Sequence, residues 1–215
     1  MQMAFRFIDP GNLVDGELEL VAPDDRWIGG MLAAARHPLT VAVSPKDAEV
    51  TRDQLEKYVR EFPLGRHKPD PSKGLVPAYS FWMRLRPISG FEPPVMMAGG
   101  LSLRIGHTEN LESYLGHIGY TVYPPARGRH LAERAVRLIL PLARRHGVDP
   151  VWITCNPDNF ASRKTCARLG GILINTVPLP EGHPLFNRGE RQKCRYLIDV
   201  KRALRTGEKR DGVVG

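Results

Sequence analysis

Two arginines near the start of a long amphipathic segment have the chemistry to bind a phosphate group. Arg127 and Arg129 flank Gly128 in a turn that follows an apolar, strand-like stretch at 116–123 and two prolines. The first turn of a helix leaves backbone N–H groups without partners inside the helix, and it carries a partial positive charge. A basic turn in this place attracts an anion, so we predict a pyrophosphate-bearing ligand there.

A second segment with chemical potential begins at the strand-like run 151–155. It continues as a polar stretch in which Asn159 opens a short helix, Ser162 supplies a small residue and Gly170 closes the helix. The two segments, in this order, resemble motifs A and B of the GNAT (Gcn5-related N-acetyltransferase) family. In that family a pattern [Arg/Gln]-x-x-Gly-x-[Gly/Ala] after a strand holds the pyrophosphate of acetyl-coenzyme A.

The resemblance carries specific residues over to this chain. Motif A falls on the hexad 127–132, which keeps the first and last positions but has His130 where the family has its central glycine. This exchange narrows the room for close backbone approach to a phosphate. The family's fourth strand also pairs its backbone with the pantetheine arm. The resemblance therefore implies cofactor contacts from Tyr120, Thr121, Val122, Arg127, Gly128, Arg129, His130, Leu131, Ala132, Asn159 and Ser162.

Acyl transfer to an amine needs a group that accepts the amine proton, and it is helped by one that protonates the departing thiolate. The family often places a glutamate base on its fourth strand, and here His117 stands near that position, with Glu112 before it. The family's general acid is commonly a tyrosine in motif B, and this chain has Cys166 at that position. Tyr196 and Tyr120 are the alternative proton donors. Our catalytic candidates are thus His117, Cys166 and Tyr196, and direct transfer predicts that Cys166→Ala keeps much of the activity.

Each of these residues also has a purely structural interpretation. Asn159 is a good helix N-cap, and Arg127 and Arg129 are equally typical of a solvated surface. The structural alternative for His117 is a histidine hydrogen-bonded within the sheet, and for Cys166 it is a small core residue.

Composition limits the class of protein. The chain has 215 residues, 42% hydrophobic and 25% charged, which suits one large domain, 1–215, with its core at about 17–201. No apolar run reaches membrane length and no signal peptide is apparent, so we expect cytoplasmic residence. The three cysteines form no metal-ligand pattern, and we expect neither a disulfide framework nor a metal.

The net charge of +8 raises a nucleic-acid interpretation. However, the basic residues are spread along the chain rather than clustered, and no nucleic-acid-binding motif accompanies them. We therefore keep a basic nucleic-acid-binding protein as the weaker alternative, beside a non-catalytic CoA-binding module, which the missing glycine and tyrosine suggest.

The order of expected elements positions the two motifs. Alternating or helical periodicity predicts strands at 17–22, 78–86, 95–105, 116–123, 151–155, 171–178 and 194–200, and helices at 27–35, 51–62 and 159–169. A long helix opened by the basic turn is expected within 127–145, with Pro141 kinking it or ending its regular part. The proline-rich segments 38–45 and 63–77 are predicted to be loops, 178–190 a long excursion, and 202–215 a flexible tail. This order resembles the GNAT layout, an α/β fold with a central mixed, twisted sheet of about seven strands, flanked by helices and splayed between strands 4 and 5.

We therefore expect an acetyl-CoA-dependent N-acetyltransferase that acts by direct transfer in a ternary complex. Its partners would be acetyl-CoA and a primary amine on a small molecule or a protein, with nucleic acid and membrane not expected. The acceptor stays unidentified, because one fold serves many substrates. Family members often pair into dimers, which leaves a homodimer as an alternative to a monomer.

Overall fold

The computed structural model describes residues 5–211 and divides the chain into two compact units. The first unit consists of Met1–Leu103 and Tyr120–Leu138, and the second of Arg104–Gly119 and Ile139–Gly215. Each unit is assembled from non-consecutive segments. One domain stays a prediction, because the units interleave along the chain instead of following each other.

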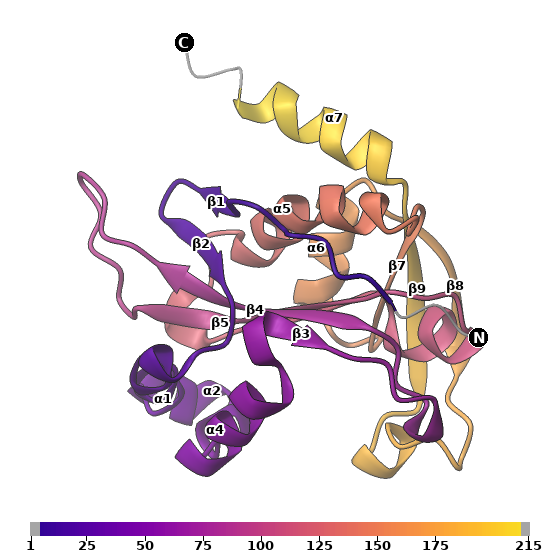
Figure 1. Cartoon of the computed structure of the whole chain (residues 1–215), viewed down its shortest axis with the longest axis horizontal. Coiled ribbons are helices and arrows are strands. Elements are labelled where there is room, and N and C mark those ends of the chain that lie inside the picture. Colours follow the sequence, from indigo (N-terminus) through magenta and orange to yellow (C-terminus); the bar gives the residue numbers. More distant parts are fainter. Residues whose placement is uncertain (1–4, 212–215) are drawn as a thin grey trace. The chain divides into compact units, whose positions relative to one another are not determined.

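The first unit is built on an antiparallel sheet (Figure 1). Its strands are β1 (Val14–Asp15), β2 (Leu18–Val21), β3 (Arg66–His67), β4 (Ala78–Leu85), β5 (Met97–Arg104) and β6 (Ile118–Val122). The order is β1-β2-β4-β5-β6, and β3 pairs with β4. β4 and β5 form the hairpin expected from their alternating pattern, and their inward residues, among them Met83, Leu85, Met97 and Leu103, are almost completely buried. β6 lies at the edge of this sheet.

Helices cover this sheet on one face (Figure 1). They are α1 (Ile28–Ala35), α2 (Pro38–Val43) and α4 (Arg52–Glu61), and the short helix α3 (Pro45–Ala48) follows α2 in the chain. α4 begins with a capping box, in which the Thr51 hydroxyl accepts from Gln54 N–H and the Gln54 side chain accepts from Thr51 N–H. The loop predicted for 38–45 is wrong. Pro38 and Pro45 each occupy the first turn of a short helix, where proline loses no hydrogen bond.

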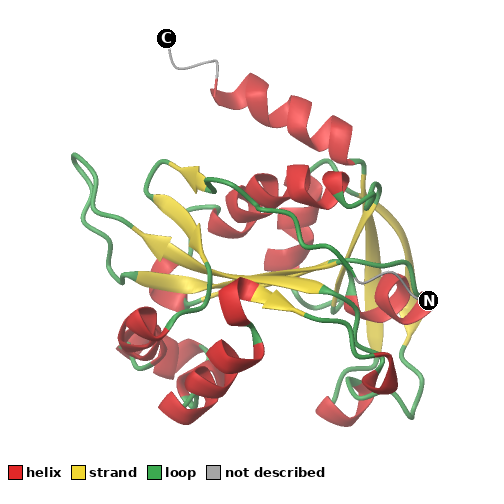
Figure 2. Cartoon of the chain, viewed as in Figure 1, coloured by secondary structure: helices red, strands yellow, loops and turns green. Residues whose placement is uncertain are grey.

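The second unit contains a three-stranded antiparallel sheet in the order β7-β9-β8 (Figure 2). Its elements are β7 (Val151–Cys155), α6 (Phe160–Arg168), β8 (Ile172–Pro178), β9 (Gln192–Ile198) and α7 (Val200–Asp211), together with the end of α5 (Leu131–Arg145). The flexible tail predicted from 202 is wrong up to residue 211, because this stretch continues α7. Residues 212–215 lie outside the described part of the chain.

The predicted α/β fold class is confirmed, but the sheet differs in one respect. All strand pairs whose register we describe are antiparallel, whereas the sequence predicts a mixed sheet. β6 and β7, the fourth and fifth strands of the predicted order, belong to different sheets.

Helix α5 contributes buried apolar residues to both units. In α5 the buried residues include Leu131, Ala135 and Val136 in the part that belongs to the first unit, and Ile139 and Leu140 in the part that belongs to the second. Within residues 5–211 no helix is both long and apolar enough to cross a bilayer. Cytoplasmic residence stays a prediction.

Candidate cofactor site

The strand expected to face the pantetheine arm is the edge strand β6. Tyr123 N–H donates to the Ala98 carbonyl of β5, which fixes the end of β6 against its neighbour. Gly99 makes this approach possible: a Cβ at this position would lie 2.0 Å from the Thr121 carbonyl oxygen, and its φ of +147° favours glycine. Because backbone groups of successive strand residues face opposite sides, Tyr120 and Val122 direct theirs away from β5.

The turn after β6 is held by the side chain of Arg127. Its Nε donates to the Val122 carbonyl at 2.9 Å, and an Nη donates to Ser44 Oγ, at the end of α2, at 3.2 Å. A short 3-10 turn, Pro124–Ala126, joins the strand to these residues. Arg127 thus ties the outer edge of β6 to the helical layer of the first unit.

Gly128 and His130 both have backbone conformations in the left-handed region, with φ of +85° and +55°. His130 therefore keeps the glycine-type backbone that a motif glycine would have, although it carries a side chain. Histidine tolerates this region better than most residues, at a cost of about 1–2 kcal/mol. The Arg134 N–H donates to the His130 carbonyl, so α5 begins immediately after the turn.

The residues around the start of α5 differ in exposure. Leu131 is buried and anchors the helix start, and Ala132 is half-buried. Arg127, Gly128, Arg129 and His130 are all exposed. A helix start with an exposed basic turn is therefore available to an anion.

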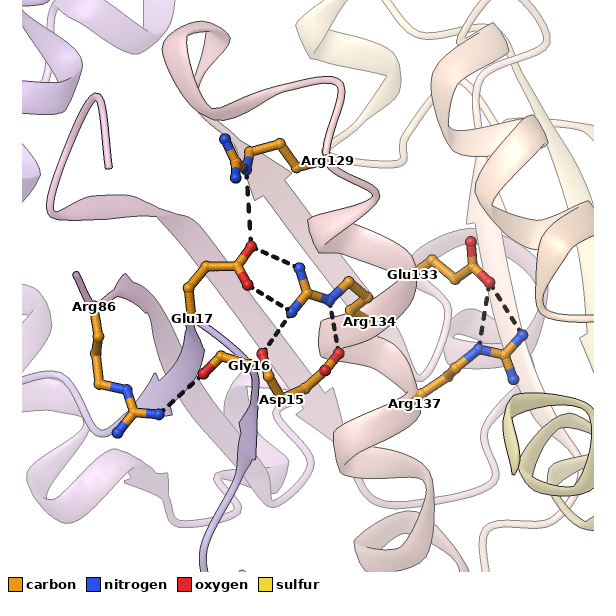
Figure 3. A network of polar contacts seen from close by, with 8 residues as sticks. All are labelled: Asp15, Gly16, Glu17, Arg86, Arg129, Glu133, Arg134 and Arg137. Atoms are coloured by element: carbon orange, nitrogen blue, oxygen red, sulfur yellow. Dashed lines mark hydrogen bonds and ion pairs between the residues drawn. The ribbon is translucent and has the colours of Figure 1, made fainter. Parts of the chain in front are cut away.

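A buried carboxylate lies under this turn (Figure 3). Glu17 is 8% exposed and accepts two hydrogen bonds from Arg134, at 2.8 and 3.1 Å. Arg134 also donates to the Asp15 side chain at 2.7 Å, and Arg129 Nε lies 3.8 Å from Glu17. The hydrogen bond from Arg134 lowers the pKa of Glu17, and this outweighs the effect of burial.

In the second unit, the motif-B residues surround the end of β7. Asn159 Oδ1 accepts from Ser162 N–H at 3.0 Å, so its expected N-cap role is confirmed. Ser162 is 8% exposed and hydrogen-bonds the thiol of Cys155. Burial raises the pKa of that thiol. The contacts of Asn159 and Ser162 with a cofactor stay predictions.

His117 lies in the chain just before β6 and is completely buried. Its Nδ1 accepts from Trp152 N–H at 2.9 Å, so Nε2 carries the proton and donates to the Gly106 carbonyl, also at 2.9 Å. Burial lowers the pKa of this imidazole. Both ring nitrogens are thus engaged in a neutral histidine, and this geometry favours the structural interpretation over that of a proton acceptor.

The only group of potential metal ligands found among the described residues is His107, Glu112 and His117, whose ligand atoms lie within 4.8 Å of one another. His107 Nδ1 and Glu112 Oε1 are 3.0 Å apart. A metal-binding histidine normally donates its second N–H to an acceptor, but His117 Nδ1 faces a backbone N–H donor. His117 therefore has no lone pair to offer, and we assign no metal site to this group.

The remaining catalytic candidates are both buried. Cys166 lies inside α6 and is completely buried. Tyr196 on β9 is 5% exposed, and its hydroxyl accepts from Arg163 Nε at 3.3 Å. Tyr196 therefore keeps its own hydroxyl proton for donation.

The candidate residues thus fall into two groups. The first unit brings together Tyr120 to Ala132, and the second brings together Asn159, Ser162 and Tyr196 around β7. Sequence reasoning missed Glu17 and Phe91, which contact Arg129 of the turn from distant segments, with the Arg129 guanidinium carbon 3.7 Å from the centroid of the Phe91 ring. It also missed the pairing of Arg134 with Glu17. The only signal for Glu17 was its charge within an alternating strand pattern.

Comparison with known proteins places the chain. The family model for the GNAT acetyltransferase domain matches residues 18–172. The search of curated proteins finds no match. Among solved structures, the microcin C7 self-immunity acetyltransferase MccE, bound to acetyl-CoA and AMP, aligns with a TM-score of 0.61 at 16% identity, covering 86% of this chain and 93% of that one.

Two further structures have the same fold. The ribosomal L7/L12 alpha-N-protein acetyltransferase RimL with coenzyme A has a TM-score of 0.59 at 19% identity, covering 87% of this chain and 97% of its own. A GNAT-family acetyltransferase from Bacillus anthracis has a TM-score of 0.58 at 12% identity, covering 88% and 99%. Because the family model matches residues 18–172, which is more than half of the chain, the chain belongs to the GNAT acetyltransferase family.

Proposed function

We propose that this protein transfers the acetyl group of acetyl-CoA directly to a primary amine, in a complex that holds both substrates. The observation that carries the proposal is the exposed basic turn 127–130 at the start of α5, directly after the edge strand β6. A pyrophosphate suits this turn, and a pantetheine arm suits the outward backbone groups of β6. Acetyl-CoA and coenzyme A in the similar structures support the choice of donor.

Direct transfer is supported by the burial of the cysteines. An acyl-enzyme needs a thiolate that reaches the thioester, but all three cysteines are buried, and burial raises the pKa of Cys155. Cys166→Ala is therefore expected to keep the activity of the folded enzyme. If this variant binds acetyl-CoA but has no turnover, the thiol carries an acetyl group or a proton and direct transfer is wrong.

Proton transfer is assigned only on the donor side. Tyr196 is the candidate that protonates the departing thiolate, because its hydroxyl accepts from Arg163 and retains a proton to give. The Asn159 and Ser162 pair at the start of α6 is the candidate contact for the pantetheine arm. We propose that the protein acts in the cytoplasm.

The first experiment is binding of acetyl-CoA, measured as a rise in the melting temperature and as a dissociation constant by calorimetry. A ligand that binds only the folded protein must raise its melting temperature. The double variant Arg127→Ala, Arg129→Ala should lose most of this rise. The matched control is Arg144→Ala, Arg145→Ala, which removes the same charge from exposed residues at the other end of α5.

The second experiment is turnover, followed as thiol release from acetyl-CoA with a panel of amines. The panel includes peptide α-amines and an amine linked to a nucleotide, because the similar structures are an alpha-N-protein acetyltransferase and one that holds AMP. Binding without turnover on any amine would favour the non-catalytic module. No binding at millimolar acetyl-CoA would refute the proposal.

A further inference from the structure

The two arginines of the turn differ in how their hydrogen-bond donors are used. A guanidinium has five N–H donors. Arg127 directs two of its nitrogens to protein oxygens, at Val122 and Ser44. Arg129 makes no side-chain hydrogen bond within the described part of the chain; its Nε lies 3.8 Å from Glu17, which is an ion pair rather than a hydrogen bond.

Arg129 is instead held by an aromatic ring. Its guanidinium carbon lies 3.7 Å from the centroid of Phe91, close enough for a strong cation–π contact. The ring has no acceptor atom, so the contact fixes the side chain without pairing its N–H groups to another oxygen. An arginine that is oriented but keeps its donors is well prepared to bind a phosphate.

Phe91 is itself firmly placed. It lies at the tip of the β4–β5 hairpin, where Ile88 and Phe91 exchange two backbone hydrogen bonds of 3.1 and 2.9 Å around a tight turn. Gly90 in this turn has a φ of +76°, which favours glycine. The ring is thus presented by a closed turn rather than by a loose loop.

Glu17 adds a second constraint on the same side chain. The carboxylate is already committed to Arg134 by two hydrogen bonds, so it offers Arg129 charge compensation at a distance without capturing its donors (Figure 3). Arg134 is fixed in turn by Asp15. Phe91 and Glu17 together restrict where the Arg129 guanidinium points.

We propose that Phe91 is a positioning residue for the cofactor: it orients Arg129 to donate to a phosphate of acetyl-CoA, while Arg127 holds the turn in shape. This inference rests on the proposed function and refines it, because it divides the two motif arginines between phosphate binding and turn structure. In this proposal Phe91 does not contact the cofactor itself and acts only by orienting Arg129.

The test is a double-variant cycle on acetyl-CoA affinity, measured by calorimetry with the full chain. Phe91→Ala should weaken binding about 3- to 10-fold, the range of a cation–π contact. In an Arg129→Ala background the same change should cost nothing further, because the residue through which Phe91 acts is gone. Phe91→Tyr keeps the ring face and should restore the affinity.

The control is Ile88→Ala, which changes the backbone partner of Phe91 on the same turn and should leave affinity unchanged. Melting temperatures identify variants that lose structure. The division between the arginines predicts that Arg127→Ala lowers the melting temperature without ligand more than Arg129→Ala does, whereas Arg129→Ala loses more affinity.

Two results would overturn the inference. In the first, Phe91→Ala binds acetyl-CoA as tightly as the parent protein does. In the second, Phe91→Ala weakens acetyl-CoA binding by the same factor in the Arg129→Ala background as in the parent protein. Either result leaves acetyl-CoA binding by the parent protein intact, so the proposed function survives. If the parent protein does not bind acetyl-CoA, the proposed function and this inference fail together.

Discussion

The basic turn of the first unit and the histidine segment of the second unit treat polar groups in opposite ways. In the turn, residues 127–130 are exposed. Arg129 is oriented by the Phe91 ring and the Glu17 carboxylate, and its side chain makes no hydrogen bond to the described part of the chain. In the histidine segment, His117 is buried and both of its nitrogens are committed to backbone groups. The first arrangement leaves hydrogen-bond donors available, whereas the second commits them to the fold.

The difference shows that the burial and partners of a residue decide its role, more than its type does. Histidine is the usual proton acceptor near neutral pH, and His117 stands close to the expected base position. A ring with a backbone donor on one nitrogen and a backbone acceptor on the other has no capacity left for a substrate. The guanidinium of Arg129 still has N–H donors for a substrate or ligand.

Removal of the buried His117 ring should have the largest effect. His117→Ala leaves the Trp152 N–H and the Gly106 carbonyl without their partners and opens a cavity, so the free energy of unfolding should fall by about 3 kcal/mol. Urea denaturation measures this. His107→Ala, at the exposed neighbouring ring, should cost well under ~1 kcal/mol. Equal losses would contradict the structural role of His117.

The same residue predicts a pH dependence with a definite sign. Because burial lowers the pKa of His117, the unfolded chain takes up a proton at a higher pH than the folded protein does. Stability from this residue is therefore present above the ordinary histidine pKa of about 6.5 and is lost as the pH falls toward the lowered value. Comparing urea midpoints of the parent and His117→Gln between pH 7.5 and 5 should show a shrinking difference.

Another prediction concerns the carboxylate beneath the turn. Glu17→Gln removes the charge that pairs with Arg134 but keeps the shape, and should cost about 2 kcal/mol at neutral pH. Because Arg134 lowers the pKa of Glu17, this cost is present above the unfolded-state value of about 4.3 and disappears as the pH falls through the lowered folded value. Denaturation of both proteins across this range measures it.

A matched control is Glu61→Gln, which removes an exposed ion pair with Lys57. Exposed pairs contribute little, so the change should cost under ~0.5 kcal/mol and show no comparable pH trend. A Glu17 variant as stable as the parent would mean that the Glu17–Arg134 pair does not support the turn.

The sequence predicts the elements well where a local pattern carries the information. β7 has the predicted bounds, and α4 and α6 differ from theirs by a residue at each end, because apolar periodicity and capping residues are local signals. The short helices α2 and α3 were missed because a proline-rich stretch looks like a loop, although proline also suits the first helical turn.

The site is predictable from the sequence only in part. The hexad 127–132 identifies the turn, since a basic segment between a strand and a helix is readable in one stretch of chain. Phe91 and Glu17 lie far from it in sequence, and nothing local reports that a hairpin tip and an edge strand meet the same arginine. The commitment of both His117 nitrogens depends on Trp152 and Gly106, which is likewise a tertiary fact.

The smallest expected effect comes from His130 and tests whether the turn tolerates its departure from the family pattern. With φ at +55°, His130 has a strained backbone conformation that glycine adopts without strain. His130→Gly removes that strain but adds freedom to the unfolded chain, so the net gain in stability should be about 0.5 kcal/mol. Leu64→Gly, at an exposed residue with the same φ, is the matched control and should gain at least as much.

Acetyl-CoA affinity separates the two positions. Both changes relieve strain, but only His130 belongs to the turn that we propose binds the phosphate. If the backbone already has the shape that binds the phosphate, His130→Gly should leave affinity within about twofold, because a single preferred conformation is exchanged for a more permissive one. If affinity instead rises tenfold or more while Leu64→Gly has no effect, the histidine side chain obstructs the phosphate, and the exposed turn would be a site that this chain has partly closed.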